Sequence, residues 1–207
     1  AASDVYKRQL VYNAALKQIN TKLEILNDEF QHVHQYNPIE HIKSRIKTSE
    51  SIVKKLRRHG YESTIENMVK YVNDIAGIRV ICSFTSDIYR IAEMIRLQND
   101  IHVIAVKDYI RLPKASGYKS YHMLVTVPVF LSDRTVDVKV EIQIRTVAMD
   151  FWASLEHKIN YKFEGNAPEH VKRELIECAG MVSALDNRMQ ELNEEIKALS
   201  KEDADGA

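Results

Sequence analysis

The chain has 207 residues, of which 45% are hydrophobic and 28% charged, a composition typical of a globular protein that buries a core without disulfide or metal staples. Lysine plus arginine equals aspartate plus glutamate at 29 each, so the formal net charge is zero, and a protein that coats nucleic acid over its whole surface is excluded. No stretch reaches the roughly 18 apolar residues of a membrane span, and Cys82 and Cys178 form no C-x-x-C pair, so we expect a cytoplasmic chain without membrane anchor, zinc knuckle or disulfide.

The two ends of the chain carry helical patterns. Residues 1–9 include a run that resembles a translated sequencing adapter, so we expect a non-native leader there and exclude it from the fold. Residues 10–35 and 168–200 repeat apolar side chains at intervals of three and four, which predicts two long helices. Each apolar seam could pack on the core or on another copy of the chain. Residues 201–207 are polar and are expected to form a flexible tail.

Helical and strand patterns alternate between these ends. Further helices are expected at residues 39–58, 65–74, 87–97 and 147–163. Strands are expected at residues 78–84, 101–106, 121–129 and 136–145, the last two forming a hairpin. The alternation predicts an α/β or α+β fold, a mixed sheet flanked by helices, in a single domain over residues 10–200.

The segment 41–60 has the most unusual predicted surface, with seven lysines and arginines against one acid, Glu50. On a helix, one face would carry Lys47, Ser51, Lys54 and Arg58, with Lys55 at its edge. Crowded cations repel one another unless an anion lies across them, and polyphosphate suits lysine, arginine and serine donors. A solvated basic face or an RNA footprint is the alternative.

Two carboxylates could face one polar cleft of the predicted sheet. The strand 136–145 alternates apolar and polar residues, so Glu141, Gln143 and Arg145 share one face, about 7 Å apart, and could line a polar cleft or simply face solvent. Asp74, just before the first predicted strand, could face the same cleft or cap its turn. Two carboxylates beside a phosphate cradle could hold Mg²⁺.

The segment between the second and third predicted strands carries an aromatic residue among cations. Ser116 and Gly117 predict a turn that leaves Tyr118 exposed beside Lys114 and Lys119. Such an aromatic is a platform for a nucleobase, and a buried tyrosine at a strand start is the alternative. No P-loop and no G-x-G-x-x-G occurs, so a nucleotide site here is of neither the Walker nor the Rossmann kind.

Four motifs, in this order, are similar to the synthetase domain of the RelA/SpoT family, whose members make the alarmones ppGpp and pppGpp. The motifs are Arg45-x-Lys47-x-x-x-Ser51, Asp74-Ile75-Ala76-Gly77-Ile78-Arg79, Gly117-Tyr118-Lys119-Ser120-Tyr121-His122 and Glu141-Ile142-Gln143-Ile144-Arg145-Thr146. The resemblance spans residues 37–163, and residues 149–158 are most similar to the RelP subgroup. It implies a small single-domain synthetase with a nucleotidyltransferase-like fold, assembled as a homotetramer through its terminal helices.

The resemblance also implies roles on the donor side of the reaction. Arg45 and Arg79 would sandwich the adenine of ATP. The donor phosphates would be held by Lys47, Ser51, Lys55 and Arg58. Asp74 and Glu141 would bind Mg²⁺ as catalytic residues, and Glu141 would also accept the proton of the acceptor ribose 3′-OH.

On the acceptor side, the resemblance implies that Tyr118 stacks on the guanine of GDP or GTP. Lys114 and His122 would meet the acceptor phosphates, with Gln143 in the same site. Asp150 would accept guanine N1–H and N2–H, although an acid in the first turn of a helix is also favoured by the helix dipole.

The implied reaction transfers the β,γ-pyrophosphoryl group of ATP to the 3′-OH of GDP or GTP, releasing AMP, in the stringent response. The alternative is a non-catalytic nucleotide- or RNA-binding regulator that uses the basic segment 41–60. The two acids argue against that alternative, because a binder of polyanions has no need of carboxylates in its cleft. RNA is therefore a possible but unexpected partner.

Overall fold

The computed structural model describes residues 2–205, and the side chains of residues 8–201. Its elements in chain order are α1 (Ala2–His34), β1 (Ile39–Ile46), α2 (Ser49–Arg58), α3 (Ile65–Tyr71), β2 (Ala76–Cys82), α4 (Thr85–Arg96), β3 (His102–Asp108), β4 (Tyr121–Phe130), β5 (Thr135–Thr146), α5 (Val147–Lys162) and α6 (Glu169–Asp205). Helix α1 begins inside the expected leader, and α6 continues to Asp205 where a flexible tail was expected from residue 201. Residues 1, 206 and 207 of these two segments lie outside the described part.

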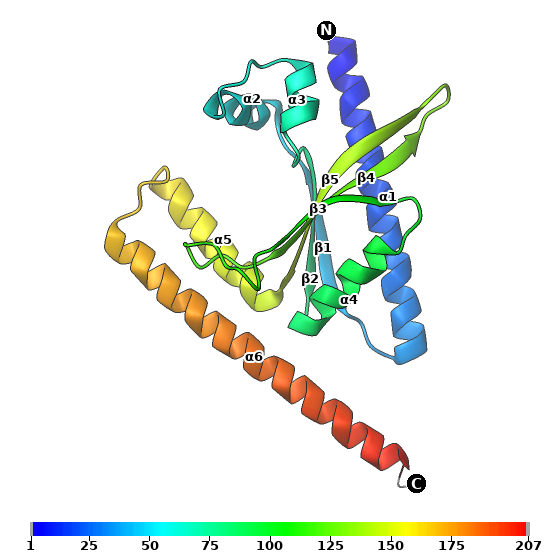
Figure 1. Cartoon of the computed structure of the whole chain (residues 1–207), viewed down its shortest axis with the longest axis vertical. Coiled ribbons are helices and arrows are strands. Elements are labelled where there is room, and N and C mark those ends of the chain that lie inside the picture. The colour runs from blue at the N-terminus through cyan, green and yellow to red at the C-terminus, as the bar shows by residue number, and fades with distance from the viewer. Residues whose placement is uncertain (1, 206–207) are drawn as a thin grey trace.

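The strands form one mixed sheet in the order β1-β2-β5-β4-β3. Strands β2 and β5 are parallel, and the other neighbouring strands are antiparallel. The predicted hairpin is the β4–β5 pair. Figure 1 views the sheet edge-on, with α1 and α4 on one side and α5 on the other. A mixed sheet flanked by helices confirms the predicted fold class.

The core lies between the sheet and helices α1 and α4. Alternate residues of β5 and β4 are buried on this side, among them Val140, Ile142 and Val125, each 0% exposed. Ile19 and Leu23 of α1, also 0% exposed, pack in the same core. The period-two alternation therefore leaves the polar residues of β5 on the opposite face.

The helix predicted over residues 39–58 is wrong in its first half, because Ile39–Ile46 is the edge strand β1. The three isoleucines Ile39, Ile42 and Ile46 have helical spacing, but a β-bulge between Ile39 and His41 shifts the register. Their β-branched side chains suit a strand, and pairing with β2 overrides the local pattern. Helix α2 begins after Thr48, whose side chain accepts a hydrogen bond from the Ser51 backbone N–H.

Because residues 39–46 form a strand, the basic residues of segment 41–60 do not all lie on one helix. Arg45 belongs to β1 and Lys47 to the link before α2, so they do not share a helix face with Ser51 and Arg58. The backbone N–H of Lys47 donates to the carbonyl of Ile75 at 2.8 Å, which fixes this link beside the start of β2.

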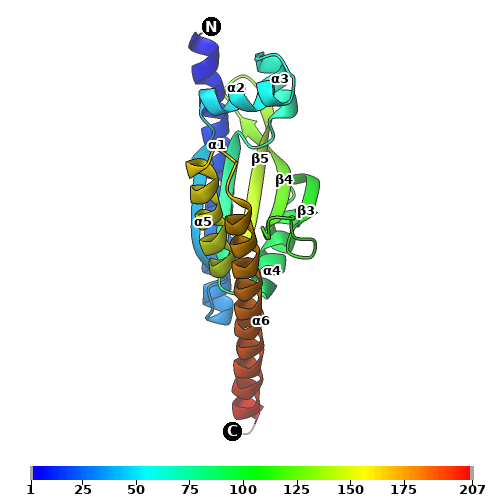
Figure 2. The same ribbon diagram turned by 90° about the vertical axis from the view of Figure 1, so that its left-hand side faces the viewer.

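Helix α6 extends well beyond the sheet (Figure 2). Its exposed apolar side chains are Ile176, Met181, Leu185, Met189, Leu192, Ile196 and Leu199. Five of them, from Leu185 to Leu199, belong to the apolar seam predicted from the sequence, so this part of the seam is exposed. Within residues 2–205, no helix combines the length and the apolar run needed to cross a bilayer.

Candidate active site

The sheet face opposite α1 and α4 carries polar side chains in rows, because paired residues on neighbouring strands point to the same side. One row across the strands is Lys43, Arg79, Gln143, His122 and Lys107. The adjacent row is Arg45, Gly77, Glu141, Leu124 and Ala105. The register of five strands thus collects side chains that lie far apart in the sequence.

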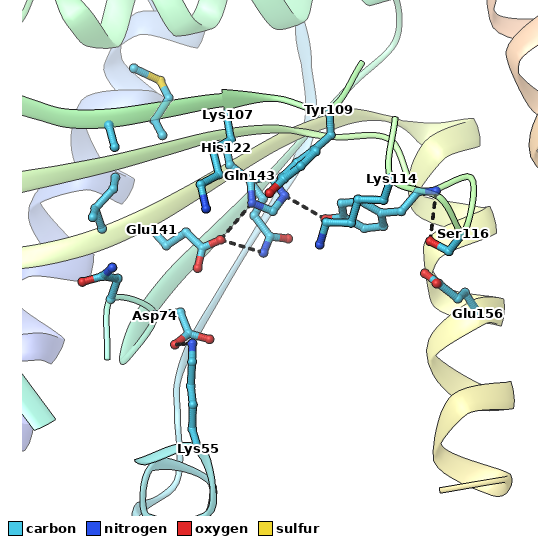
Figure 3. A pocket seen from close by; sticks show the side chains of 15 residues that line it. Lys55, Asp74, Lys107, Tyr109, Lys114, Ser116, His122, Glu141, Gln143 and Glu156 are labelled. Atoms are coloured by element: carbon cyan, nitrogen blue, oxygen red, sulfur yellow. Dashed lines mark hydrogen bonds and ion pairs between the residues drawn. The ribbon is translucent and has the colours of Figure 1, made fainter. Parts of the chain in front are cut away.

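Two cavities open on this face. One, of about 660 Å³, lies over β1, β2 and α5, and is lined by Arg45, Arg79 and Arg145 among others. The other, of about 480 Å³, lies over β3 and β4 beneath the loop that carries Lys114 and Tyr118 (Figure 3). Both are lined by Asp74, Tyr118, Glu141, Gln143 and Glu156. We call them the donor-side cavity and the acceptor-side cavity, after the roles that the sequence resemblance predicts for their lining residues.

Asp74 lies directly before β2, as expected, and is held by two lysines. Its Oδ2 is 2.8 Å from Lys47 Nζ and its Oδ1 is 2.7 Å from Lys55 Nζ. Burial alone would raise the pKa of Asp74, but the hydrogen bonds from Lys47 and Lys55 outweigh it and lower that pKa below its usual value. Asp74 is therefore a carboxylate at neutral pH.

Glu141 is the second carboxylate between the cavities. Its Oε1 lies 3.1 Å from His122 Nδ1 and accepts a hydrogen bond from Gln143 Nε2 at 3.3 Å (Figure 3). Burial would raise the pKa of Glu141, but the hydrogen bond with His122 outweighs burial, and the pKa is lowered. Glu141 is thus an ionised acceptor near Asp74.

Tyr118 is half-buried, so it is neither the fully exposed platform nor the buried tyrosine that the sequence allowed. Its hydroxyl accepts a hydrogen bond from Arg145 Nη2 at 2.7 Å and lies 2.8 Å from His122 Nε2. Burial raises the pKa of Tyr118, so the hydroxyl keeps its proton. Lys114 Nζ lies 4.7 Å from the centroid of the Tyr118 ring. The ring is therefore held at its hydroxyl end, and the Lys114 ammonium lies over its face.

The donor-side cavity contains the two predicted arginines from neighbouring strands. Arg45 of β1 lies in the row next to Arg79 of β2, and both line the cavity. A Cβ on Gly77, the partner of Arg45, would lie 3.9 Å from Arg45 Cγ, with no closer contact. The missing side chain leaves the floor of the cavity open beside Arg45.

A family described as "Region found in RelA / SpoT proteins" matches residues 44–166, more than half of the chain. The chain belongs to the RelA/SpoT family. It is 48% identical over 187 residues to GTP pyrophosphokinase YwaC of Bacillus subtilis, covering 90% of this chain and 89% of that protein. It is 38% identical over 193 residues to GTP pyrophosphokinase YjbM of the same organism, covering 93% and 90%.

Solved structures of this RelA/SpoT group share the fold. The crystal structure of small alarmone synthetase 2 from Bacillus subtilis matches with a TM-score of 0.85 at 45% identity, over 93% of this chain and 99% of that one. Small alarmone synthetase 1 from the same organism matches in a complex with its product pppGpp, at TM-score 0.85 and 38% identity over 92% and 97%. Its complex with AMPCPP matches at TM-score 0.80 and 35% identity over 94% and 99%.

Four of the predicted residues are not among those that line the two cavities of this RelA/SpoT chain. Lys47 lines neither cavity, although its Nζ contacts Asp74, which lines both. Ser51 and Arg58 of α2 are exposed and are not among the residues that line either cavity. Asp150 lies in the first turn of α5, where its Oδ1 is 3.4 Å from both Arg79 Nη1 and Arg145 Nη1. The structure therefore joins Asp150 to two arginines and does not bring it to the acceptor-side cavity.

Several cavity residues had no predicted role, and Glu156 and Lys107 are two of them. Glu156 of α5 lines both cavities, and Lys107 of β3 lines the acceptor-side cavity next to His122. The largely apolar residues 101–106 indicate a strand but not its neighbour in the sheet, so they could not assign Lys107 to the site. Glu156 lies four residues after Trp152 in the predicted helix 147–163, so the two side chains share one helical face, and this was the signal that could have placed Glu156 near the site.

Proposed function

We propose that this chain is a (p)ppGpp synthetase, which transfers the β,γ-pyrophosphoryl group of ATP to the 3′-OH of GDP or GTP and releases AMP. The observation that carries the proposal is the pair of cavities that adjoin at Asp74 and Glu141. A transfer between two nucleotides requires two binding sites that meet at the reacting atoms. The named activity of the relatives, and the pppGpp and AMPCPP complexes of small alarmone synthetase 1, support this assignment.

ATP would bind in the donor-side cavity. Arg45 and Arg79 present planar guanidinium groups that suit the faces of adenine. Lys47 and Lys55, which neutralise Asp74 in the free protein, would turn to the donor phosphates. Ser51 and Arg58 stay predicted phosphate ligands at the outer side of α2.

GDP or GTP would bind in the acceptor-side cavity. Guanine would stack on Tyr118, which requires Lys114 to leave the ring face, and Lys114 then becomes a donor to the acceptor phosphates. His122 and Gln143 line the same cavity and would contact the ribose and phosphates. Asp150 is engaged by two arginines, so its predicted contact with guanine is not part of the site that we propose.

Mg²⁺ fits the two carboxylates. Asp74 and Glu141 line both cavities, and the described residues contain no group of three or more histidine, cysteine, aspartate or glutamate side chains that could hold a metal ion by themselves. Mg²⁺ is typically held by one or two carboxylates together with substrate phosphates, which matches a pair of acids between two nucleotide cavities. When bound, the ion would neutralise charge on the transferred pyrophosphoryl group.

Three side chains of the protein would act directly in the transfer. Glu141, ionised at neutral pH, accepts the proton of the acceptor 3′-OH as the O3′–Pβ bond forms. The bond from Pβ to the bridging oxygen of the α-phosphate breaks, and AMP leaves with the electron pair. Lys47 and Lys55 stabilise the phosphate charge near the site of bond exchange.

A homotetramer built through the terminal helices is supported by the exposed apolar face of α6. The proposed substrates, ATP and GDP or GTP, support the prediction of a cytoplasmic enzyme that acts in the stringent response. Membership of the RelP subgroup stays a prediction from residues 149–158.

The test is incubation with labelled ATP, Mg²⁺ and either GDP or GTP, followed by separation of the nucleotides. We expect equal amounts of AMP and of ppGpp or pppGpp. Binding of both nucleotides without product, or tight binding of single-stranded RNA instead, would favour the non-catalytic regulator.

A further inference from the structure

Five side chains between the two cavities form a closed ring of hydrogen bonds. Arg145 Nη2 donates to Gln143 Oε1 at 2.6 Å and to the Tyr118 hydroxyl at 2.7 Å. The Tyr118 hydroxyl meets His122 Nε2 at 2.8 Å. His122 Nδ1 and Gln143 Nε2 both reach Oε1 of Glu141, at 3.1 and 3.3 Å.

Arg145 can only donate, which fixes the direction of its own two bonds and of the bond from Gln143 to Glu141. Gln143 must turn its amide oxygen toward Arg145, so its amide nitrogen faces Glu141. Tyr118 accepts from Arg145, so its own proton is free to go to His122 Nε2. A neutral His122 that accepts at Nε2 carries its proton on Nδ1, which faces Glu141.

Both arms of the ring therefore start at Arg145 and end on one oxygen of Glu141. Arg145 is 2% exposed, so this starting point is fixed in the protein interior. Oε1 is engaged by His122 and Gln143, whereas Oε2 of Glu141 makes no hydrogen bond within the described side chains. Oε2 is thus the oxygen left to face a substrate.

We infer that the hydroxyl of Tyr118 is a positioning group for Glu141. This inference, which rests on the proposed function, gives Tyr118 two separable roles. Its ring binds the acceptor base, and its hydroxyl fixes the tautomer of His122, which holds the carboxylate so that Oε2 meets the 3′-OH. Without the hydroxyl, His122 can place its proton on Nε2, and the Nδ1 lone pair then repels Oε1 of Glu141.

Replacing Tyr118 by phenylalanine separates the two roles, because the ring remains and the hydroxyl is lost. We expect Tyr118→Phe to lower kcat about tenfold, the effect of about one hydrogen bond, and to change KM for GDP less than about threefold. Tyr118→Ala should in addition raise KM for GDP about tenfold or more, because the stack is lost. Tyr121→Phe is the matched control, since Tyr121 packs edge-on against Tyr89 and its hydroxyl has no hydrogen bond among the described side chains.

A second variant tests whether the hydroxyl acts through His122. In His122→Asn the amide nitrogen can replace Nδ1 as donor to Glu141, and an amide has no alternative tautomer. Adding Tyr118→Phe to His122→Asn should therefore change kcat less than about twofold, although the same change costs about tenfold in the wild-type background. Near-UV circular dichroism would verify that each variant keeps the native packing.

Three outcomes are decisive. A Tyr118→Phe variant with kcat within twofold of wild type overturns the inference. An equal loss from Tyr118→Phe with and without His122→Asn overturns it also, because the hydroxyl would then act directly on substrate. A wild-type protein that forms no alarmone contradicts the proposed function itself, and is recognised before any variant is compared.

Discussion

Substituting Gly117 by alanine tests how the loop that carries Tyr118 is held on helix α6. Gly117 has a φ of +93°, and a Cβ added there would lie 2.7 Å from Ala179 Cβ of α6 and 3.4 Å from Trp152 Cζ2 of α5. Alanine in a left-handed conformation costs about 1–2 kcal/mol. Overpacking against Ala179 and Trp152 costs about 1–3 kcal/mol more. The loop or the helix must therefore move.

Acceptor binding should report this movement, because Tyr118 follows Gly117 directly. We expect Gly117→Ala to raise KM for GDP about tenfold, as the stack on Tyr118 is worth about 1–3 kcal/mol, and to leave KM for ATP nearly unchanged. Gly165→Ala is the matched control, with a φ of +83° and no atom within 4 Å of the added Cβ. It introduces the backbone strain without the contact.

A compensating change sharpens the test. Gly117→Ala combined with Ala179→Gly removes the closest contact, so KM for GDP should return most of the way to the wild-type value. Steady-state kinetics with GDP varied, and thermal unfolding of each variant, measure both effects. If Gly117→Ala and Gly165→Ala lower Tm equally and neither changes KM for GDP, the loop does not depend on its contact with α6.

Glu141→Gln should lower alarmone synthesis by about 10²–10⁴ with the fold retained, and a variant that keeps more than about a tenth of the wild-type kcat would remove Glu141 from the catalytic role. Burial raises the pKa of Asp186, even though the Thr146 hydroxyl donates a hydrogen bond to it at 2.6 Å. The folded state therefore favours the protonated form of Asp186, and the stability of the protein falls as the pH rises from the usual pKa of aspartate through the raised one. Asp186→Asn should therefore raise Tm near pH 7–8 and lose this advantage in acid, and an unchanged Tm at both pH values would contradict the effect of burial. Leu192→Glu on the outer face of α6 should lower the mass measured by light scattering if that face builds the oligomer, and a monomeric wild-type protein would contradict the assembly.

The sequence predicted most of the sheet because alternation of apolar residues is a local signal. Strand β5 alternates without interruption from Val136 to Arg145, and the structure keeps that order of faces. Strand β1 was missed because three isoleucines at helical spacing mimic one face of a helix. The β-bulge at His41, which reconciles that spacing with a strand, exists only through pairing with β2.

In the candidate site, too, local patterns were predicted from the sequence and long-range contacts were not. The side chains of Glu141, Gln143 and Arg145 lie on one polar face, as alternation predicts, and Asp74 lies just before β2. The contacts of Asp150 with Arg79 and Arg145 could not be read from its motif, because Arg79 lies on β2, far from Asp150 in the sequence. Long-range ion pairs are set by strand order and register, which local patterns do not contain.

Strand order also explains why the two cavities meet where they do. Strands β2 and β5 are the parallel pair, so the residue before β2 and the middle of β5 lie near each other, and Gly77 is paired with Glu141. The donor-side cavity lies on the β1 and β2 side of β5, and the acceptor-side cavity lies on the β4 and β3 side. In the reaction that we propose, the pyrophosphoryl group would pass from one cavity to the other over β5, where Glu141 lines both. Glu141, the base in the proposed reaction, therefore lies on the central strand of the sheet, where Gln143 of the same strand and His122 of the next strand both contact its Oε1.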